Sequence, residues 1–283
     1  MAGTWAHVKR RWTPLFGRLL LTGVVAGLLV VAHLSRHQAV SGWPRASPLD
    51  QTPTRTAELL AALYQYLETP EPCCRRLQRF GGAANGDGDK LVCMDAALRP
   101  PPGRCLVYSV GVANDWSFDR AMVEHGCEVH SFDPTVGRPD GPTEFGGHFH
   151  AVGLTGDNSS AQQPMRMATL AQLRAQLGHQ RRDIDYLKVD IEGNEWSWLD
   201  GEELEVFKHV RQLGMEVHFL DLEHSPSSYE PVLWYFETFQ FLREQGFCLV
   251  SATENVVVPK RLSLPGMTEK KALLFEMVWV KSK

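Results

Sequence analysis

The amino-acid sequence predicts an α/β fold with a mostly parallel sheet, and two stretches carry this prediction. In residues 105–133 an apolar strand stops at Gly111, a helix begins near Ser117 with its hydroxyl as N-cap, and a second strand ends at Asp133. In residues 185–219 two further apolar strands end in charged side chains. Strand–helix–strand units of this kind place their strands in parallel.

The first residues of the chain differ in composition from the rest. Basic residues precede a charge-free segment, residues 19–32, and the apolar span reaches twenty residues over 15–34 if Arg18 extends to the interface. We therefore expect a cytosolic tail (1–14) and a transmembrane signal anchor (15–34), with the rest of the protein in the lumen of the Golgi or ER. A cleaved signal for secretion and a mitochondrial leader are the alternatives.

Proline-rich residues 35–55 predict a linker, and residues 56–103 predict a helical N-terminal extension. In that extension Leu59, Leu63 and Leu67 recur at helical spacing, which predicts a helix over 56–68, and a second short helix is expected over 75–80. Residues 104–283 would form the main domain. Its remaining elements are a strand over 148–152, helices over 170–177 and 231–245, strands over 247–251 and 272–280, and a basic, mobile loop over 259–271.

The net charge and the cysteines indicate whether a nucleic-acid partner or a zinc site is to be expected. The formal net charge is −4, so we expect no nucleic-acid partner. The six cysteines fit the luminal location, but there is no Cys-x-x-Cys pair that would predict zinc. We expect Cys127 and Cys248 to be small buried hydrophobic residues. Asn158 begins a sequon for glycosylation.

Gly111 and Asp133 predict a nucleoside site. They lie twenty-two residues apart, close to the spacing at which dinucleotide folds place a glycine turn and an acid that binds ribose. A glycine there lets backbone N–H groups approach a ligand. However, Ala113 and Trp116 occupy the positions of the second and third glycines of a dinucleotide fingerprint. S-adenosylmethionine has a ribose and no phosphate, so the pattern favours this methyl donor.

The acids after two later strands predict a pocket. Asp190 and Glu192 end one strand, and Glu216 and His218 end the next. Open α/β sheets bind ligands outside the carboxyl ends of their strands. We expect His218 to act as general base, oriented by Glu216, with Glu192 as the second candidate base. His148 and His150 could form a metal pair, but no third ligand is nearby and we expect no metal site.

Longer segments resemble a known family. They read CLVYSVGVANDWSFD, GCEVHSFDPT, IDYLKVDIEGNEW and MEVHF, with RRLQRFGG and VCMD upstream. In this order they resemble the methyltransferase-like protein 24 group, relatives of the FkbM-type O-methyltransferases. The resemblance implies a seven-strand Rossmann-like class I methyltransferase sheet, S-adenosylmethionine, and methyl transfer to an oxygen of a small-molecule or glycan acceptor. The expected cofactor-binding residues are Ser109, Gly111, Asn114, Asp133 and Asp190.

Two other functions remain open on the sequence. A luminal glycosyltransferase could bind a divalent metal and a nucleotide diphosphate with two acidic pairs, Asp190 with Glu192 and Asp221 with Glu223. A catalytically inactive binding protein could keep the fold without the reaction. Ser109 favours this second alternative, because many class I methyltransferases have an acid two residues before the first glycine.

Overall fold

The computed structural model describes residues 53–82, 88–156, 165–201 and 204–282. The predicted tail (1–14), the anchor (15–34), all but the end of the linker (35–55) and the Asn158 sequon lie outside these residues. Within the described ranges, no helix is long and apolar enough to cross a membrane. The described residues from Pro53 onward belong to one compact unit.

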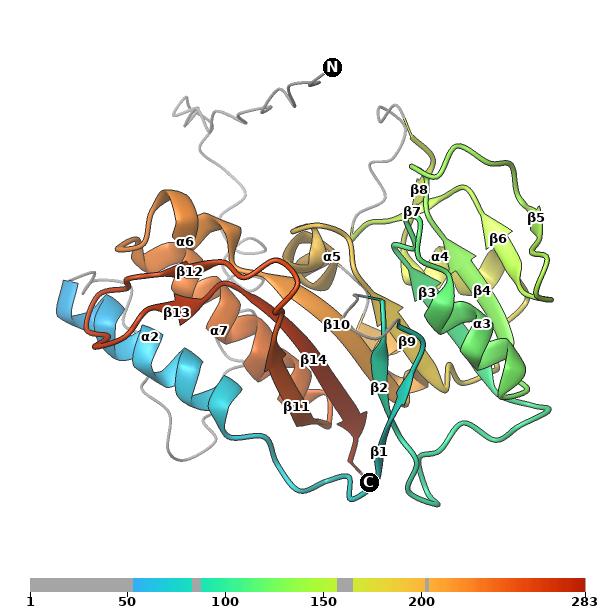
Figure 1. Ribbon diagram of the computed structural model, residues 1–283, viewed down its shortest axis with the longest axis horizontal. Helices are drawn as coiled ribbons and strands as arrows, with labels where there is room; N and C mark the ends of the chain where they lie inside the picture. The colour runs from blue at the N-terminus through green and yellow to red at the C-terminus, as the bar shows by residue number, and fades with distance from the viewer. Residues whose placement is uncertain (1–52, 83–87, 157–164, 202–203, 283) are drawn as a thin grey trace, which may run out of the picture. The chain divides into compact units, whose positions relative to one another are not determined.

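An eight-stranded sheet forms the centre of this unit (Figure 1). Its strand order is β11-β14-β10-β9-β3-β4-β6-β5. Neighbouring strands from β10 to β6 pair in parallel, while β14 is antiparallel to both of its neighbours and β5 is antiparallel to β6. The strands are β3 (Leu106–Val110), β4 (Glu128–Phe132), β5 (Gly141–Pro142), β6 (His148–His150), β9 (Tyr186–Val189), β10 (Gln212–His218), β11 (Phe247–Glu254) and β14 (Leu274–Lys281).

The predicted mostly parallel sheet is therefore confirmed, and the expected number of seven strands is exceeded by one. The additional strand, β5, has only two residues and lies at the edge of the sheet. It belongs to the Gly/Pro-rich segment after Asp133 that the sequence marks as a loop. Two residues without apolar periodicity give no strand signal, which explains why β5 was not predicted.

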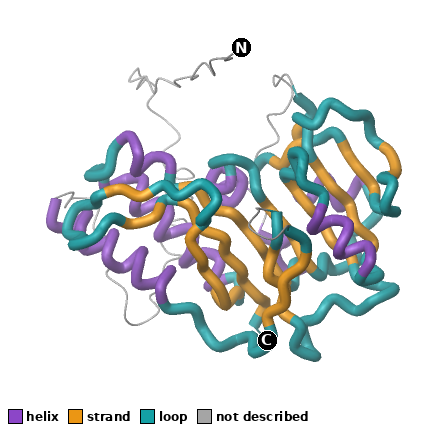
Figure 2. The backbone as a smooth tube through the Cα atoms, viewed as in Figure 1, coloured by secondary structure: helices purple, strands orange, loops and turns teal. Residues whose placement is uncertain are grey.

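Helices lie on both faces of the sheet (Figure 2). On one face, α3 contacts Val107 and Val129; on the other, the segment after α4 lies beside Tyr108, whose hydroxyl is 2.8 Å from His179 Nδ1. α2 packs on α7, which in turn packs on β11. The helices are α2 (Pro53–Glu68), α3 (Ser117–Glu124), α4 (Leu170–Gln176), α5 (Glu195–Gly201), the 3-10 helix η2 (Leu204–His209), α6 (Leu220–His224) and α7 (Tyr229–Glu244).

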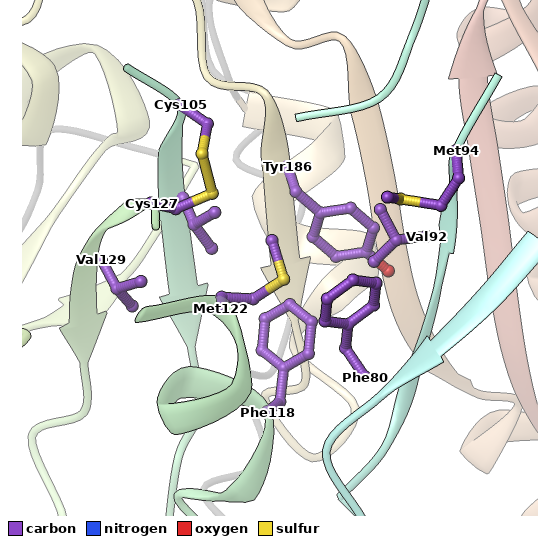
Figure 3. Packing of buried hydrophobic residues seen from close by; sticks show 10 residues of the cluster. Phe80, Val92, Met94, Cys105, Phe118, Met122, Cys127, Val129 and Tyr186 are labelled. Atoms are coloured by element: carbon purple, nitrogen blue, oxygen red, sulfur yellow. A yellow bond between two sulfur atoms is a disulfide. The ribbon is translucent and has the colours of Figure 1, made fainter. Parts of the chain in front are cut away.

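Among the residues of the N-terminal extension that the structure describes, only those of α2 are helical. The helix predicted over residues 75–80 is wrong, because β1 (Leu77–Phe80) pairs with β2 (Lys90–Cys93) as an antiparallel hairpin. Phe80 and Val92 of this hairpin are buried against Tyr186 of the sheet and Phe118 of α3 (Figure 3). The hairpin thus covers the same face of the sheet as α3.

The basic segment over residues 259–271, expected to be a mobile loop, is ordered by strand pairing. β12 (Arg261–Leu262) pairs with β13 (Lys271–Ala272), and Leu264 between them is buried. Arg261 also donates two hydrogen bonds to Glu254. A further short pair, β7 (Gly153–Leu154) with β8 (Met167–Ala168), lies before α4.

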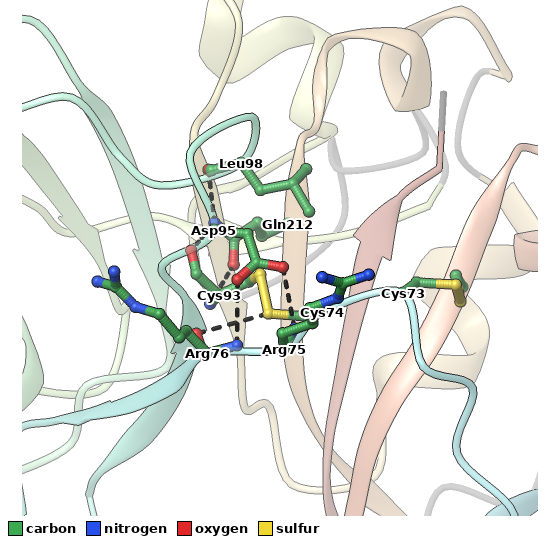
Figure 4. Close-up of a disulfide and its surroundings, with 9 residues drawn as sticks. Cys73, Cys74, Arg75, Arg76, Cys93, Asp95, Leu98 and Gln212 are labelled. Carbon is green, nitrogen blue, oxygen red and sulfur yellow. Dashed lines mark hydrogen bonds between the residues drawn. A yellow bond between two sulfur atoms is a disulfide. The ribbon is translucent and has the colours of Figure 1, made fainter.

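All six cysteines form disulfides, joining Cys73 to Cys248, Cys74 to Cys93 and Cys105 to Cys127. Cys127 and Cys248 are buried as expected, but each is joined in a disulfide and neither is simply a small hydrophobic residue. Around the Cys74–Cys93 bond, the Asp95 carboxylate accepts two backbone N–H bonds and the Gln212 amide bonds to Cys93 (Figure 4). The extension is thus tied covalently to the hairpin and to β11.

Candidate functional site

The glycine turn after β3 packs against the end of β9. Gly111 has φ +76°, and a Cβ at this position would lie 1.6 Å from the Asp190 carbonyl oxygen. Its N–H already donates to the Phe132 carbonyl, and its own carbonyl accepts a hydrogen bond from Lys188 Nζ. Close backbone packing therefore explains the glycine, and its N–H is not open to a ligand as the glycine turn had predicted.

Asp133 uses its carboxylate to shape this turn. One oxygen accepts N–H bonds from Val112 (3.0 Å) and Ala113 (2.8 Å), and the other accepts the Thr135 N–H (2.8 Å) and hydroxyl (2.6 Å). Burial alone would raise the pKa of Asp133, but these four bonds lower it. A carboxylate has about four acceptor positions. All four are filled, so the geometry gives no support to the predicted contact with ribose.

Replacing Asp133 with asparagine is expected to destabilise the protein by about 2–3 kcal/mol, because each carboxylate oxygen faces two donors and an amide nitrogen would oppose one pair. Urea unfolding measures this difference. Asp115→Asn is the matched control, since the N–H bond that Asp115 accepts from Ser117 is exposed. Equal stability of the two variants would show that the Asp133 carboxylate does not hold the turn.

Ser109 points away from the turn into a buried polar group beneath α3. It is 0% exposed and donates to Asp119 Oδ2 at 3.1 Å, and Ser131 donates to the other oxygen. Burial raises the pKa of Asp119, although Lys188 and the two hydroxyls oppose that shift. Asp119 was not predicted, because a first-turn acid in a helix usually caps it. Ser117 is not the N-cap expected; its hydroxyl accepts the Gly82 N–H.

Asp190, Glu216 and His218 meet at the carboxyl ends of β9 and β10; we call these three residues the strand-end cluster. Each offers one ligand atom within 4.8 Å of the other two. The cause is the parallel register, which places Met215 opposite Val189 and so sets Glu216 beside Asp190. The sequence prediction that neighbouring strands bring these side chains together is confirmed. Of the other predicted cofactor residues, Asn114 is exposed on the turn and is not part of the cluster.

Glu195, which the sequence analysis missed, lies closest to the inner nitrogen of His218. Its Oε1 is 3.4 Å from His218 Nδ1, whereas Glu216 is on the other side of the ring, 3.9 Å from Nε2. The expectation that Glu216 orients His218 is therefore wrong. Glu195 is fully buried and its Oε1 accepts the N–H groups of Ile191 and Gly193. A carboxylate two residues after a glycine in a tight turn is the signal that could have predicted it.

These charges control the protonation of the cluster. Burial would lower the pKa of His218, but Glu195, then Glu216 and Asp190, raise it well above its ordinary value. Burial raises the pKa of Glu216, and Asp190 adds to that shift. His218 therefore carries a proton at neutral pH and cannot accept one, which argues against the predicted base. Glu192, with a side chain 89% exposed and 3.8 Å from His218 Nε2, is the better candidate.

Histidines of β4 and β6, together with His179, form a separate, closed group. The two ring nitrogens of His130 lie 3.0 Å from Glu128 Oε1 and 2.9 Å from His150 Nε2. His179 Nε2 is also 3.3 Å from Glu128. The predicted pair, His148 and His150, stacks on the His130 ring. Burial lowers the pKa of His130 to about 4 and also lowers those of His150 and His179. We interpret this group as structural.

Protonation of His130 should cost stability. Its folded-state pKa of about 4 lies below the ordinary 6.5, so between these values the unfolded chain binds more protons and stability falls as pH falls. The stability advantage of the wild type over His130→Gln should shrink by about 2 kcal/mol from pH 7 to pH 4, after allowance for partial solvent screening. The raised pKa of Glu216 makes stability change with pH in the opposite direction. Because Glu216 is present in both proteins, its contribution cancels in the difference. Urea unfolding at several pH values measures it; a difference independent of pH contradicts the expectation.

Comparison with known proteins identifies the family. Residues 37–264 match a family model described as a methyltransferase domain. Two curated relatives, from Homo sapiens and Rattus norvegicus, are both named probable methyltransferase-like protein 24. The human protein is 28% identical over 212 residues, covering 69% of this chain and 57% of its own length. The rat protein is 28% identical over 225 residues, covering 74% and 61%. The chain thus spans about three-fifths of the length of these relatives.

Solved structures give only distant likenesses. A precorrin-6y C5,15-methyltransferase from Geobacter metallireducens has a TM-score of 0.31 at 10% identity, covering 63% of this chain and 81% of its own. A precorrin 8w decarboxylase from Methanobacterium thermoautotrophicum has 0.32 at 13%, covering 75% and 98%. Such scores add nothing to the assignment. On the family match and its curated relatives, the chain belongs to the methyltransferase domain family and is related to methyltransferase-like protein 24, as its motifs predicted.

Proposed function

We propose that this protein is an S-adenosylmethionine-dependent methyltransferase that methylates an oxygen of a small-molecule or glycan acceptor in the secretory-pathway lumen. The observation that carries the proposal is the strand-end cluster, which lies beside the glycine turn in a chain of the methyltransferase domain family. Ligands of open α/β sheets bind at this edge of the sheet. The family assignment favours methyl transfer over glycosyl transfer, and the cluster of acids at the sheet edge supports an active site over an inactive binding protein.

The residues at this edge fit the charged sulfur and the ammonium group of S-adenosylmethionine better than they fit its ribose. S-adenosylmethionine supplies a methyl group on a positively charged sulfur, and it also carries an ammonium group. Asp190, whose side chain is 21% exposed, and the exposed Glu192 provide negative charge for these groups beside Gly111. Asp133 does not fit the ribose role, because its acceptor positions are filled. We therefore assign Asp133 to the shape of the turn and place Asp190 at the edge between the cofactor and the acceptor.

Methyl transfer to a hydroxyl also requires that its proton be removed. Glu192 is the residue we assign to this step, because its carboxylate is exposed at the rim of the strand-end cluster. Its φ of +56°, unusual for a residue with a side chain, holds it in the turn that follows β9. Such strain is often found at functional positions. His218 and Glu216 lie deeper and would line the acceptor side of the site.

The test uses the full-length protein with its disulfides intact. Calorimetry should detect binding of S-adenosylmethionine and S-adenosylhomocysteine, and a labelled methyl group should pass to an acceptor in small-molecule or glycan fractions. Glu192→Gln should lower turnover by about 10²–10⁴ and leave cofactor affinity nearly unchanged. Glu205→Gln, at an exposed acid paired with Lys208, is the control. Cofactor binding without turnover on any acceptor would favour the inactive binding protein, and absence of cofactor binding overturns the proposal.

The glycosyltransferase alternative has less support. Of its two acidic pairs, the second is already engaged: Asp221 accepts a hydrogen bond from the Tyr235 hydroxyl (2.7 Å), and Glu223 pairs with Lys260 (2.5 Å). These side chains therefore have other structural roles. Binding of a nucleotide sugar with manganese, in place of S-adenosylmethionine, would reverse this preference.

The luminal location is supported by the disulfides, since such bonds persist in oxidising compartments. This agrees with a signal anchor over residues 15–34 that leaves the N-terminus cytosolic. The membrane contact would then be made by the anchor, and the net charge of −4 gives no reason to propose a nucleic-acid partner. Protease protection in microsomes, together with a glycan at Asn158, would test this orientation.

A further inference from the structure

The strand-end cluster has the side chains of a metal site. Two carboxylates and an imidazole, from Asp190, Glu216 and His218, converge with ligand atoms within 4.8 Å of one another. Ligands of one divalent ion lie about 2.0–2.2 Å from it, and therefore about 3–3.5 Å from each other. The three groups would need to move together by roughly an ångström, which rotation of side chains provides.

His218 presents an unused nitrogen to this cluster. The residue is 5% exposed, and among the residues that the structure describes its Nε2 has no hydrogen-bond partner. The nearest oxygens, of Glu192 at 3.8 Å and Glu216 at 3.9 Å, are beyond hydrogen-bond reach. Its other ring nitrogen, Nδ1, is buried without a hydrogen bond among the described residues, so neither nitrogen of this buried imidazole is satisfied. Unsatisfied buried polar groups are unfavourable, and an imidazole that points Nε2 at two carboxylates therefore indicates an occupant.

The surroundings also resemble the outer layer of a metal site. Metal-binding histidines usually turn their second nitrogen toward a carboxylate, and metal-binding carboxylates are themselves hydrogen-bonded. Here Glu195 Oε1 lies 3.4 Å from His218 Nδ1, and Trp196 Nε1 donates to the His218 carbonyl at 2.8 Å. The buried Asn255 amide donates to Glu216 Oε1 at 2.7 Å. Neighbouring residues therefore contact both His218 and Glu216 and position them.

Acids outnumber positive groups around the strand-end cluster, and a bound cation would reduce this excess. Asp190, Glu195 and Glu216 are joined by two further acids, the exposed Glu192 and the half-buried Glu276. Two lysines face these five acids: Lys188 Nζ is 3.8 Å from Asp190, and Lys90 Nζ is 2.7 Å from Glu276. Five acids thus face two lysines and the protonated His218, so the acids outnumber the positive groups by two, and a divalent ion would displace the His218 proton and reduce this excess.

We propose that Asp190, Glu216 and His218 bind one divalent cation of the manganese or zinc class. Imidazole nitrogen suits zinc, and carboxylate oxygen suits manganese, so the mixed donor set favours these ions over calcium or magnesium. Three protein ligands leave open coordination positions at the sheet edge. Under the methyl transfer proposed above, a hydroxyl bound there would lose its proton to Glu192 more readily.

The proposal is tested without the methyl donor, so that its outcome does not depend on the methyltransferase activity. Full-length protein is treated with EDTA, exchanged into metal-free buffer and titrated with Mn²⁺ and, separately, with Zn²⁺ by calorimetry, with the Mn²⁺ signal followed by electron paramagnetic resonance. We expect one ion per chain. Asp190→Asn and His218→Gln should each weaken the binding at least tenfold, and Asn255→Ala, which removes a positioning residue, should weaken it about tenfold.

Glu128→Gln is the matched control, because Glu128 lies in the other group of one carboxylate and two histidines and should not change the affinity. Thermal melts confirm that each variant is folded; if His218→Gln is not, Asp190→Asn, at a partly exposed side chain, decides. Loss of either ion's binding in Asp190→Asn with binding kept in Glu128→Gln supports the site. The proposal is overturned if neither ion binds, if Asp190→Asn binds as tightly as the wild type, or if Glu128→Gln removes the binding.

Discussion

Replacing Gly111 with alanine is expected to prevent stable folding. The added Cβ would lie 1.6 Å from the Asp190 carbonyl oxygen, a backbone atom that cannot rotate away. Relief requires the turn after β3 and the end of β9 to separate, which breaks the Gly111 N–H bond to Phe132 and disturbs the strand-end cluster. We expect a loss of at least about 4 kcal/mol, near the upper limit for a single substitution.

Gly178→Ala provides the matched control. Gly178 has φ +74°, almost the same as the +76° of Gly111, but a Cβ there would meet nothing within 4 Å. This variant therefore measures the cost of a left-handed alanine alone, about 1–2 kcal/mol. Urea unfolding of both variants separates conformational strain from backbone collision. If both lose the same stability, the close contact between Gly111 and Asp190 is not present in the protein.

The parts of the fold that the sequence predicts are those encoded by local periodicity. β3, β4, β9 and β10 are short apolar runs bounded by glycine or charge, and their order follows from the helices between them. The same logic placed the strand-end cluster, since alternation puts Glu216 and His218 on one face of β10. Parallel neighbours then end at one edge of the sheet, so Asp190 had to lie close by.

The parts that the sequence did not predict depend on contacts between distant segments. β1 has only two apolar residues, Leu77 and Phe80, and it becomes a strand because β2 pairs with it and α3 covers it. The four bonds of Asp133 depend on where the turn directs the N–H groups of Val112 and Ala113. Ala113 has φ +45°, which no local sequence rule for alanine suggests.

The position of Glu195 beside His218 has the same origin, because it follows from a turn whose geometry the sequence does not reveal. Glu192 and Gly193 both have positive φ, at 56° and 96°, and this brings the first residue of α5 back over the end of β9. Only then can one carboxylate accept two N–H bonds and face His218. The choice of Glu216 as the orienting acid used strand alternation alone, and that rule does not apply to a turn.

The pairing of the cysteines could not have been predicted, since six cysteines allow fifteen connectivities. The adjacent residues Cys73 and Cys74 bond to different elements, β11 and β2, so sequence spacing gives no guide. What the bonds achieve is clearer from the fold. Cys73–Cys248 attaches the extension to β11, whereas Cys74–Cys93 lies within the extension and Cys105–Cys127 within the main domain.

Removal of the Cys73–Cys248 disulfide is expected to cause the largest loss of stability among the three. This bond closes a loop of 175 residues, whereas Cys105–Cys127 closes one of 22. In the chain-entropy model these loops correspond to about 5 and about 3 kcal/mol, and measured losses are often smaller. We therefore expect Cys73→Ala/Cys248→Ala to lose more stability than Cys105→Ala/Cys127→Ala, in urea unfolding without reductant.

Both alanine pairs replace cysteines with the same small residue, so the two variants differ mainly in the length of the loop that the disulfide had closed. The second pair lies inside the core formed with Val107 and Met122, so its loss also leaves a small cavity. That effect works against the expected order, which makes the order a stringent test. In reductant the wild type loses its disulfides, so its free energy of unfolding should fall toward those of the two variants. If the short-loop variant is the less stable one, packing at Cys105 and Cys127 outweighs loop closure, and the role assigned to the Cys73–Cys248 bond is wrong.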